Sequence, residues 1–340
     1  MKNKQGFGAL AAIVAIVVVV LVAGGIWYYT KQSQPALSTQ TTSNNSSTTP
    51  TQPSQQAATV PGSGPLIYVA DYGNNRIEEF NASGTYVDQF GSEGTGNGRF
   101  RGPISVAINQ SGDVYVADSN NNRVEEFSSN GTYISQFGSN GSGNGKTSQP
   151  VFLTINKDGN VFVTAANGVQ EFSSSGVYIA SIGSYGLGTG QLEAPWGIAI
   201  NQSGDIYITD SSRVEEFSPS GTYLAQFGSE GKGNGQFFTA QHIAVNATGD
   251  VYVVDTIAGR IQEFSPSGVY LNQFGSSGAG NGQFKDPSDI TIDQSGNIYV
   301  ADFGNNRIEE FNASGTYISQ FGSSGTGNGQ FFEPSGITIH

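Results

Sequence analysis

The sequence has no cysteine among its 340 residues, and it has only two histidines, His242 and His340. Without cysteine there can be no disulfide, no thiolate metal site and no cysteine nucleophile. Two histidines cannot assemble a zinc site of the kind built from several histidines. We therefore expect no metal, no cofactor and no cysteine-based catalysis.

Charge is also sparse, at 12% of the residues, and acidic residues are missing from residues 1–60. The remaining 280 residues hold all 27 acidic residues against 11 basic ones. Proteins that bind nucleic acid need clustered Lys and Arg to neutralise phosphates. The strongly acidic body of this chain argues against a nucleic-acid partner.

An uncharged apolar run extends from Ala9 to Tyr29, which matches the roughly 20 residues that a helix needs to cross a membrane. Lys2 and Lys4 precede it, and aromatic residues at its end suit the membrane interface. We predict a short cytoplasmic end at 1–8, a transmembrane helix at 9–29, and the rest of the chain outside the cell. The alternative is a cleaved secretory signal, but the run is longer than such signals and no clear cleavage site follows it.

The opening KNKQGF resembles a type IV pilin-like leader, in which cleavage would follow Gly6. The acidic residue expected five positions later is replaced by Ala11, so pilus assembly is not expected. Residues 30–60 are rich in Ser, Thr, Gln and Pro and have little to bury, which predicts a disordered linker.

Glycine is abundant, with 48 residues, and one short β-rich segment recurs along the rest of the chain. The segment, IYVAD or a close variant, recurs every 45–47 residues at Asp71, Asp118, Thr164, Asp210, Asp255 and Asp302. A period of this length with several strand-like runs is typical of β-propeller blades. In the second unit we expect strands at 104–108, 114–118, 123–127 and 132–137, joined by tight glycine turns.

The two ends of residues 61–340 complement each other. This region enters with the second strand of a unit, in PLIYVAD, and leaves with the first strand of another, in PSGITIH. Pairing the two makes one blade from both ends and leaves no open sheet edge. We predict an all-β, six-bladed propeller of four-stranded antiparallel blades over 61–340, with the first blade closed by the C-terminal strand.

The run DYGNNRIEEF from Asp71 to Phe80 resembles the NHL repeat, whose naming tripeptide falls on Asn75, Arg76 and Ile77. Arg stands where the family has His, and related tripeptides occupy the same place in the other five units. The resemblance covers residues 65–340. It implies a six-bladed propeller that usually serves as a binding platform, and it implies no particular activity.

Recurring acidic residues have structural explanations. We expect five ion pairs that brace the turn between the second and third strands, and as exposed pairs they would contribute little stability: Asp71–Arg76, Asp118–Arg123, Asp210–Arg213, Asp255–Arg260 and Asp302–Arg307. A second set is expected on a solvated outer face: Glu79, Glu126, Glu171, Glu216, Glu263 and Glu310. The glycine-rich loop at 91–100 lacks the following helix that a phosphate cradle requires.

The candidate binding face holds the loops between blades and the turns between second and third strands. The units differ most at the start of each innermost strand, and the candidate ligand-binding residues there are Trp196, Gln241, His242, Ser288, Asp289, Ser105 and Phe152. Tyr72, Tyr185 and Phe303 would extend the same surface. The alternative explanation is ordinary drift among exposed positions.

These observations favour a membrane-tethered extracytoplasmic scaffold that binds a protein or a glycan. A propeller lyase or a lactone or ester hydrolase is the alternative, because His242 and Asp289 occupy equivalent positions on adjacent blades and suit an acid–base pair. Some six-bladed propellers of similar outline are such enzymes, but supporting residues are scarce, so we do not expect catalysis. A purely structural spacer remains the third alternative.

Overall fold

The computed structural model describes residues 20–22, 25–27, 64–166 and 168–340. The chain divides into two units between Ala57 and Ala58. In the first unit, β1 (Val20–Val22) and β2 (Gly25–Trp27) form an antiparallel pair. The second unit holds six four-stranded sheets.

The predicted transmembrane helix, 9–29, falls mostly outside the described residues, and the cytoplasmic end, 1–8, and the linker, 30–60, fall entirely outside them. The parts of 9–29 that are described are β1 and β2 and not helix. Within the described residues, no helix is long and apolar enough to cross a membrane. The membrane anchor therefore stays a prediction from the sequence.

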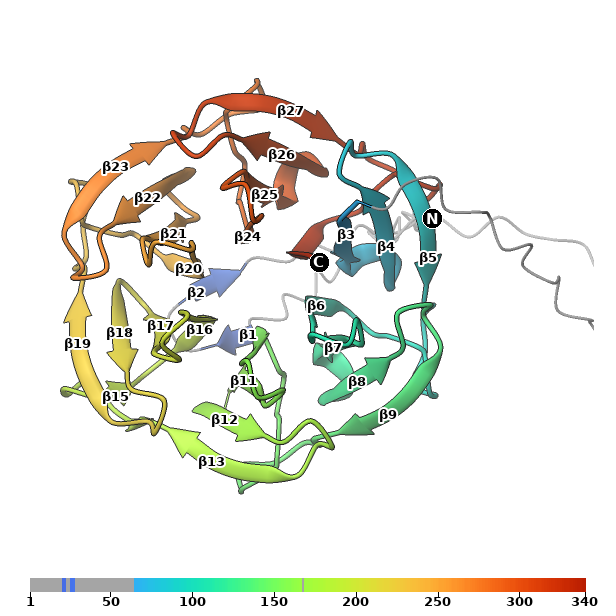
Figure 1. Cartoon of the computed structure of the whole chain (residues 1–340), viewed down its shortest axis with the longest axis horizontal. Helices are drawn as coiled ribbons and strands as arrows, with labels where there is room; N and C mark the ends of the chain where they lie inside the picture. The colour runs from blue at the N-terminus through green and yellow to red at the C-terminus, as the bar shows by residue number, and fades with distance from the viewer. Residues whose placement is uncertain (1–19, 23–24, 28–63, 167) are drawn as a thin grey trace, which may run out of the picture. The chain divides into compact units, whose positions relative to one another are not determined.

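The six sheets are arranged around a common centre, with each innermost strand nearest that centre (Figure 1). Blade 1 is β28 (Pro334–Ile339), β3 (Leu66–Asp71), β4 (Arg76–Asn81) and β5 (Tyr86–Phe90). Blade 2 is β6 (Pro103–Ile108), β7 (Val114–Asp118), β8 (Arg123–Phe127) and β9 (Tyr133–Phe137). Blade 3 is β10 (Leu153–Ile155), β11 (Val161–Ala165), β12 (Gly168–Phe172) and β13 (Tyr178–Ile182).

The remaining blades repeat this order. Blade 4 is β16 (Pro195–Ile200), β17 (Ile206–Asp210), β18 (Arg213–Phe217) and β19 (Tyr223–Phe227). Blade 5 is β20 (Ala240–Val245), β21 (Val251–Asp255), β22 (Arg260–Phe264) and β23 (Tyr270–Phe274). Blade 6 is β24 (Asp289–Ile292), β25 (Ile298–Asp302), β26 (Arg307–Phe311) and β27 (Tyr317–Phe321). A short parallel pair, β14 (Ser184–Tyr185) and β15 (Gln191–Leu192), lies in the loop between blades 3 and 4.

The six-bladed ring and its closure by the two ends of the propeller are confirmed. β28 pairs antiparallel with β3 in the sheet order β28-β3-β4-β5. Beyond the strands, the backbone N–H groups of His340 and Leu66 each donate to the other's carbonyl oxygen. The strands of blade 2 match the ranges expected for the second sequence repeat within one residue, since β6 begins at Pro103 and β9 at Tyr133.

The hydrophobic core lies between neighbouring blades. Each seam joins apolar residues of two adjacent sheets, as where Tyr68 and Ile77 of blade 1 pack with Val106 and Val116 of blade 2. We call the connection from the outermost strand of one blade to the innermost strand of the next a crossover loop. Most crossover loops insert a phenylalanine into the seam, and Phe100 lies 5.5 Å from Phe127, centroid to centroid.

Glycine is required where each crossover loop begins. Gly91 has φ +89°, and a Cβ there would lie 2.3 Å from the Phe100 ring. Any larger residue would be strained in its backbone and would displace the inserted aromatic. The recurring glycines therefore let a loop turn sharply over its own aromatic anchor.

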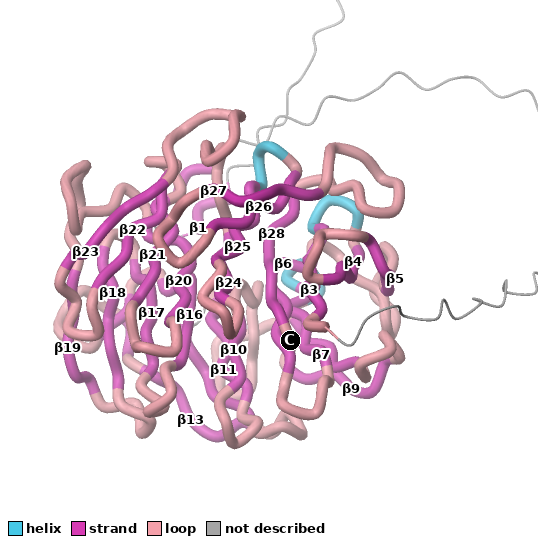
Figure 2. The backbone as a smooth tube through the Cα atoms, turned by 45° about the horizontal axis from the view of Figure 1, so that its top comes forward, coloured by secondary structure: helices cyan, strands magenta, loops and turns pink. Residues whose placement is uncertain are grey.

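The crossover loops and the turns between second and third strands gather on one side, as expected, and we call this side the loop face. The Gly73 amide donates to the Phe332 carbonyl, and the Asn120 amide donates to the Arg101 carbonyl, so turn and crossover loop are bonded directly. Figure 2 shows the strands running between two layers of loops.

Deleting residues 331–340 tests the closure. The truncation removes β28 and leaves β3 as an unpaired inner strand, so we expect one cooperative transition at a melting temperature at least about 10 °C lower. Calorimetry of the full and truncated chains measures this. The exposed substitution Phe332→Ser within the same segment is the control and should change little; an unchanged melting temperature in the truncated chain would contradict the closed ring.

Candidate functional site

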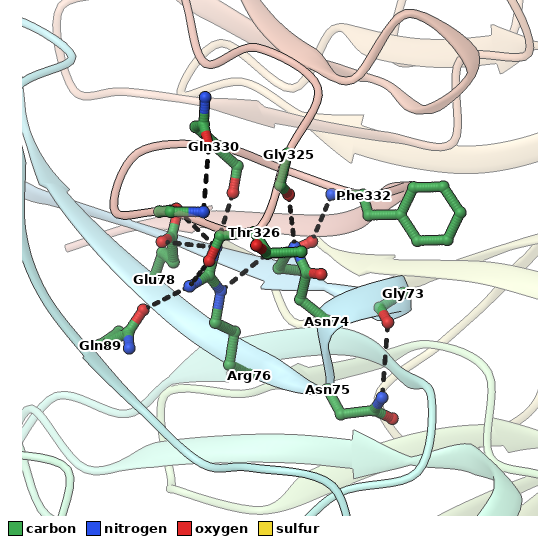
Figure 3. A network of polar contacts seen from close by, with 12 residues as sticks. Gly73, Asn74, Asn75, Arg76, Glu78, Gln89, Gly325, Thr326, Gln330 and Phe332 are labelled. Atoms are coloured by element: carbon green, nitrogen blue, oxygen red, sulfur yellow. Dashed lines mark hydrogen bonds and ion pairs between the residues drawn. The ribbon is translucent and has the colours of Figure 1, made fainter. Parts of the chain in front are cut away.

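In five of the six blades, an arginine on the third strand binds the crossover loop that enters that blade. In blade 1 the Arg76 Nε donates to Asp71 Oδ2 at 2.8 Å, and Nη1 donates to Gln89 Oε1 at 2.7 Å. Its Nη2 donates to the carbonyl oxygens of Gly327 and Gln330 at 2.9 and 2.7 Å. Figure 3 shows this guanidinium lying between its own blade and the incoming loop. One side chain thus ties blade 1 to blade 6.

The aspartate completes the contact. Asp71 Oδ1 accepts the backbone N–H of Phe332 at 2.8 Å, and Oδ2 also accepts from Asn74 at 2.7 Å. Burial raises the pKa of Asp71, while the hydrogen bonds from Phe332, Asn74 and Arg76 act against that rise. We call this Asp–Arg pair with its crossover loop the clamp.

All five expected pairs are joined in the structure: Asp71–Arg76, Asp118–Arg123, Asp210–Arg213, Asp255–Arg260 and Asp302–Arg307, with N–O distances of 2.8–3.0 Å. The expectation that they are exposed is wrong, because the aspartates are at most 1% exposed. The pairs are buried since the crossover loop of the previous blade covers them. Buried pairs are costly to break one partner at a time.

Blade 3 lacks the clamp. Thr164 and Gly168 stand at the places of the aspartate and arginine. Here Gln170 donates to the Lys146 carbonyl at 3.1 Å, and Thr147 donates to the Asn122 carbonyl at 3.1 Å. Neutral hydrogen bonds therefore hold this crossover loop where the other blades use charge.

The second acidic set does not form a solvated outer face. Glu79 is 7% exposed and the other five are half-buried. In four blades the carboxylate accepts the hydroxyl of a second-strand tyrosine at 2.8–3.1 Å: Tyr115–Glu126, Tyr207–Glu216, Tyr252–Glu263 and Tyr299–Glu310. The expectation was wrong because a tyrosine hydroxyl buried in a seam needs an acceptor.

The preceding glutamates were not singled out from the sequence, although the EE doublet contains them. Glu78, Glu125, Glu215 and Glu309 are fully buried. Burial is the main cause that raises the pKa of Glu78, Glu125 and Glu309 to about 7, and it raises that of Glu215 as well. The signal that could have found them is strand alternation, which puts adjacent residues on opposite faces.

The centre of the loop face is held by hydroxyl groups that link each blade to the next. Thr209 Oγ1 donates to the Gln241 carbonyl at 2.8 Å, and Thr256 Oγ1 donates to the Pro287 carbonyl at 2.9 Å. Ser288 Oγ donates to the Pro334 carbonyl at 3.2 Å, and Ser335 Oγ donates to the Ile104 carbonyl at 2.9 Å. These bonds knit the inner strands into a circle.

Two of the candidate ligand-binding residues, Gln241 and Ser288, take part in this circle. Six of the seven are buried, namely Ser105, Phe152, Gln241, His242, Ser288 and Asp289, and Trp196 is half-buried. They were expected to be accessible at the mouth of the central channel, and in this respect the structure differs. These positions vary between blades, and different side chains form the hydrogen bonds between neighbouring blades. Their role in ligand binding stays a prediction.

His242 and Asp289 are brought together from blades 5 and 6. The His242 Nδ1 lies against Asp289 Oδ1, and Asp289 Oδ2 accepts the Ile337 amide of blade 1 at 2.8 Å. The His242 ring also packs on Phe152 at 4.3 Å between centroids. Phe152 and His242 belong to blades 3 and 5, and blade 4 lies between them. Blade 4 has Gly197 next to His242, and a Cβ at Gly197 would lie only 2.6 Å from the His242 Cα.

Two hollows lie among the loops. One of about 340 Å³ is lined by Thr256, Ile257, Lys285 and Asp286 among others. The other, of about 380 Å³, is lined mainly by polar groups that include Asn120, Asn121 and Asn140. Within the described residues, no group of three or more His, Cys, Asp or Glu could hold a metal ion.

Removing one partner of a clamp should cost more than removing both. Arg123→Gly leaves the buried Asp118 without its cation, for an expected loss of about 3–5 kcal/mol in the free energy of unfolding. The double variant Asp118→Thr, Arg123→Gly copies the residues of blade 3 and should recover part of that loss. Denaturant unfolding measures both, and a double variant no more stable than Arg123→Gly would refute the buried pair.

Comparison with known proteins supports the repeat assignment. Three segments, residues 100–127, 192–214 and 284–311, match the family described as the NHL repeat. The segments lie in blades 2, 4 and 6 and include the first two strands of each. No curated protein matches the chain.

Several solved structures share the fold. A protein of unknown function from Bacteroides caccae has a TM-score of 0.62 at 18% identity, over 82% of this chain and 99% of that one. A chain of a nidogen/laminin complex gives 0.61 at 16%, over 81% and 98%. Virginiamycin B lyase from Staphylococcus aureus gives 0.53 at 13%, over 75% and 80%.

A gluconolactonase from Xanthomonas campestris gives a TM-score of 0.53 at 14% identity, over 70% of this chain and 82% of that one. At such identities the likeness establishes the fold alone, because this fold carries many functions. Three segments of the chain therefore match the NHL repeat, and residues 64–166 and 168–340 fold as a six-bladed β-propeller.

Proposed function

We propose that the chain is a membrane-tethered, extracytoplasmic binding scaffold whose loop face takes a protein partner. The observation that supports this most is a set of exposed apolar side chains on the loop face. Tyr185 is 81% exposed, Leu187 68%, Ile257 66% and Phe238 39%. Exposed apolar surface of this kind is what a protein partner covers, and these side chains lie in the crossover loops on both sides of blade 4 and in a turn of blade 5.

These residues depart from an otherwise repeated pattern. The place of Tyr185 in its crossover loop is taken elsewhere by Glu93, Asn140, Glu230, Ser277 and Ser324. Phe238 stands where the other crossover loops have Arg101, Ser148, Glu193, Lys285 and Phe332, so one further loop is also apolar at this place. The scaffold is repeated while the exposed side chains of blades 3 to 5 become apolar, which favours a protein over a glycan because aromatic and aliphatic anchors dominate protein interfaces.

The tether rests on the sequence. The uncharged run 9–29 and the Ser, Thr, Gln and Pro-rich stretch 30–60 support a propeller held at some distance outside a membrane. Residues 61–340 carry a net negative charge, which would attract a partner with a basic surface.

The double variant Tyr185→Ser, Leu187→Ser tests the loop face. We expect it to weaken capture of a cross-linked surface partner by at least about tenfold, because it removes two exposed anchors. Quantitative capture with the full-length chain, in parallel with the unmodified protein, measures the loss. The control is Ile134→Ser, Ile179→Ser, since these side chains are 48% and 47% exposed on the outermost strands. Equal losses in both variants would contradict a loop-face site, and capture that only a free glycan competes away would favour the glycan partner.

A second candidate is an enzyme, a lyase or a lactone or ester hydrolase that uses the buried pair His242 and Asp289 near the centre of the loop face. The contact between His242 Nδ1 and Asp289 Oδ1 favours it, because an aspartate that orients an imidazole is the arrangement a general base needs. Two of the similar propellers are named a lyase and a gluconolactonase.

His242→Ala is expected to abolish turnover of any lactone, ester or cyclic peptide substrate found in a screen, by at least about 100-fold. His340→Ala is the matched control and should keep full activity. If the screen finds no substrate, or if both variants remain equally active, the enzyme alternative fails and the scaffold stands alone.

A further inference from the structure

Each of the four buried glutamates on the third strands has an oxygen without a hydrogen-bond partner, and Glu215 has two, although its Oε1 lies 3.0 Å from the Arg213 Nη2. Gly98 donates its amide to Glu125 Oε1 at 3.2 Å, and Gly329 and Gly282 do the same for Glu78 and Glu309 at 3.2 Å. The second oxygen, Oε2, has no hydrogen-bond partner in Glu78, Glu125, Glu215 or Glu309. An ionised carboxylate at full burial with an unpaired oxygen is strongly disfavoured.

The glutamine at the equivalent position of blade 5 shows which hydrogen bonds a side chain makes there. Gln262 occupies the same register position, and its Oε1 accepts the Gly235 amide at 2.9 Å, as the glutamates do in their blades. Its amide nitrogen Nε2 donates to the Gln236 carbonyl at 2.7 Å. In blade 3, Gln170 likewise accepts from Gly145 at 2.8 Å and donates to the Lys146 carbonyl at 3.1 Å. The position therefore calls for one acceptor and one donor.

The equivalent carbonyl exists in the glutamate blades and has capacity for a second donor. Arg123 Nη2 donates to the Arg99 carbonyl at 2.6 Å, and Arg76 Nη2 donates to the Gln330 carbonyl at 2.7 Å (Figure 3). In blade 5 the corresponding carbonyl, that of Gln236, accepts from both Arg260 and Gln262. A carbonyl has two lone pairs, so a glutamate Oε2 that carries a proton can fill the same role.

The net charge of each clamp also indicates that these glutamates carry a proton. In blade 5 one Asp and one Arg sum to zero beside the neutral Gln262, and blade 3 has lost the Asp and the Arg and holds the neutral Gln170. An ionised glutamate in the other four blades would leave each with one uncompensated negative charge. The aspartate receives three or more donated hydrogen bonds in blade 2, from Arg101, Asn121 and Arg123, so the charge belongs there and the proton belongs on Glu125.

We propose that Glu78, Glu125, Glu215 and Glu309 are protonated in the folded protein, each donating from Oε2 to a crossover-loop carbonyl, and that they form a pH-sensitive latch between blades. The carbonyls are those of Gln330, Arg99, Gln191 and Gln283 respectively. Loss of the four protons replaces four hydrogen bonds with four buried charges. The crossover loops make up the loop face, so deprotonation loosens the surface proposed above for binding.

The groups around each glutamate set the direction of the response. The arginine of the clamp favours ionisation, whereas burial and the clamp aspartate oppose it. A tyrosine on the outermost strand also faces each of three of them, Tyr86, Tyr133 and Tyr317, and is neutral in this range. Burial wins and raises the pKa of Glu78, Glu125 and Glu309 from 4.5 to about 7. The folded state thus binds more protons than the unfolded state between about pH 4.5 and 7, and stability falls as the pH rises through that window.

The quadruple variant Glu78→Gln, Glu125→Gln, Glu215→Gln, Glu309→Gln tests the latch, because it places a permanent donor at every site. We expect the melting temperature of the native chain to fall by at least about 5 °C between pH 5 and pH 8. The variant should match the native chain at pH 5 and lose much less at pH 8; part of the slope remains because burial also raises the pKa of Glu79 to about 7. The control Glu93→Gln, Glu230→Gln removes charge at exposed sites and should keep the native slope.

The reciprocal variant Gln262→Glu decides the matter even if the quadruple variant fails to fold. It should lower the melting temperature at pH 8 and leave it nearly unchanged at pH 5. Infrared spectra at pH 6 should show a protonated carboxyl band in the native chain that is weaker in the quadruple variant. A native melting temperature that does not fall with pH, or a Gln262→Glu loss that is equal at both pH values, would overturn the latch.

Discussion

The pairing of β28 with β3 is the constraint on which this propeller depends. Six sheets pack around a centre only if the last sheet meets the first, and here a single strand from the far end of the chain makes that contact. The chain has no cysteine to secure it covalently. Backbone hydrogen bonds and the seams of neighbouring blades therefore maintain closure, and every other feature described above assumes it.

The clamps extend this closure from the centre to the loop face. Each buried Asp–Arg pair also bonds to the crossover loop from the preceding blade, so an interaction between residues three or five apart in sequence stabilises a contact between blades. At the centre, hydroxyl groups of threonine and serine do the same for the inner strands. Polar contacts thus join neighbouring blades near the centre and at the clamps, and apolar packing joins them along the seams.

Much of this architecture could be predicted from the sequence, since repeats state the same local rule several times. The blade count, the composite first blade and the Asp–Arg partnership follow from period, register and joint loss in blade 3. Burial could not be predicted in the same way. The sequence shows that Glu78 and Glu79 adjoin, but which of them accepts a crossover-loop amide depends on Gly329, which lies some 250 residues away. The same limit applies to Ser288 and Asp289, whose partners come from β28.

Blade 3 differs from its neighbours in having lost the aspartate, the arginine and the glutamate together. Its crossover loop is held by uncharged groups, and its innermost strand, β10, is only three residues long. The consequence is an asymmetric circle, in which five sectors are fastened by charged pairs while one sector, two blades away from the blade that holds β28, is fastened by the neutral groups described above.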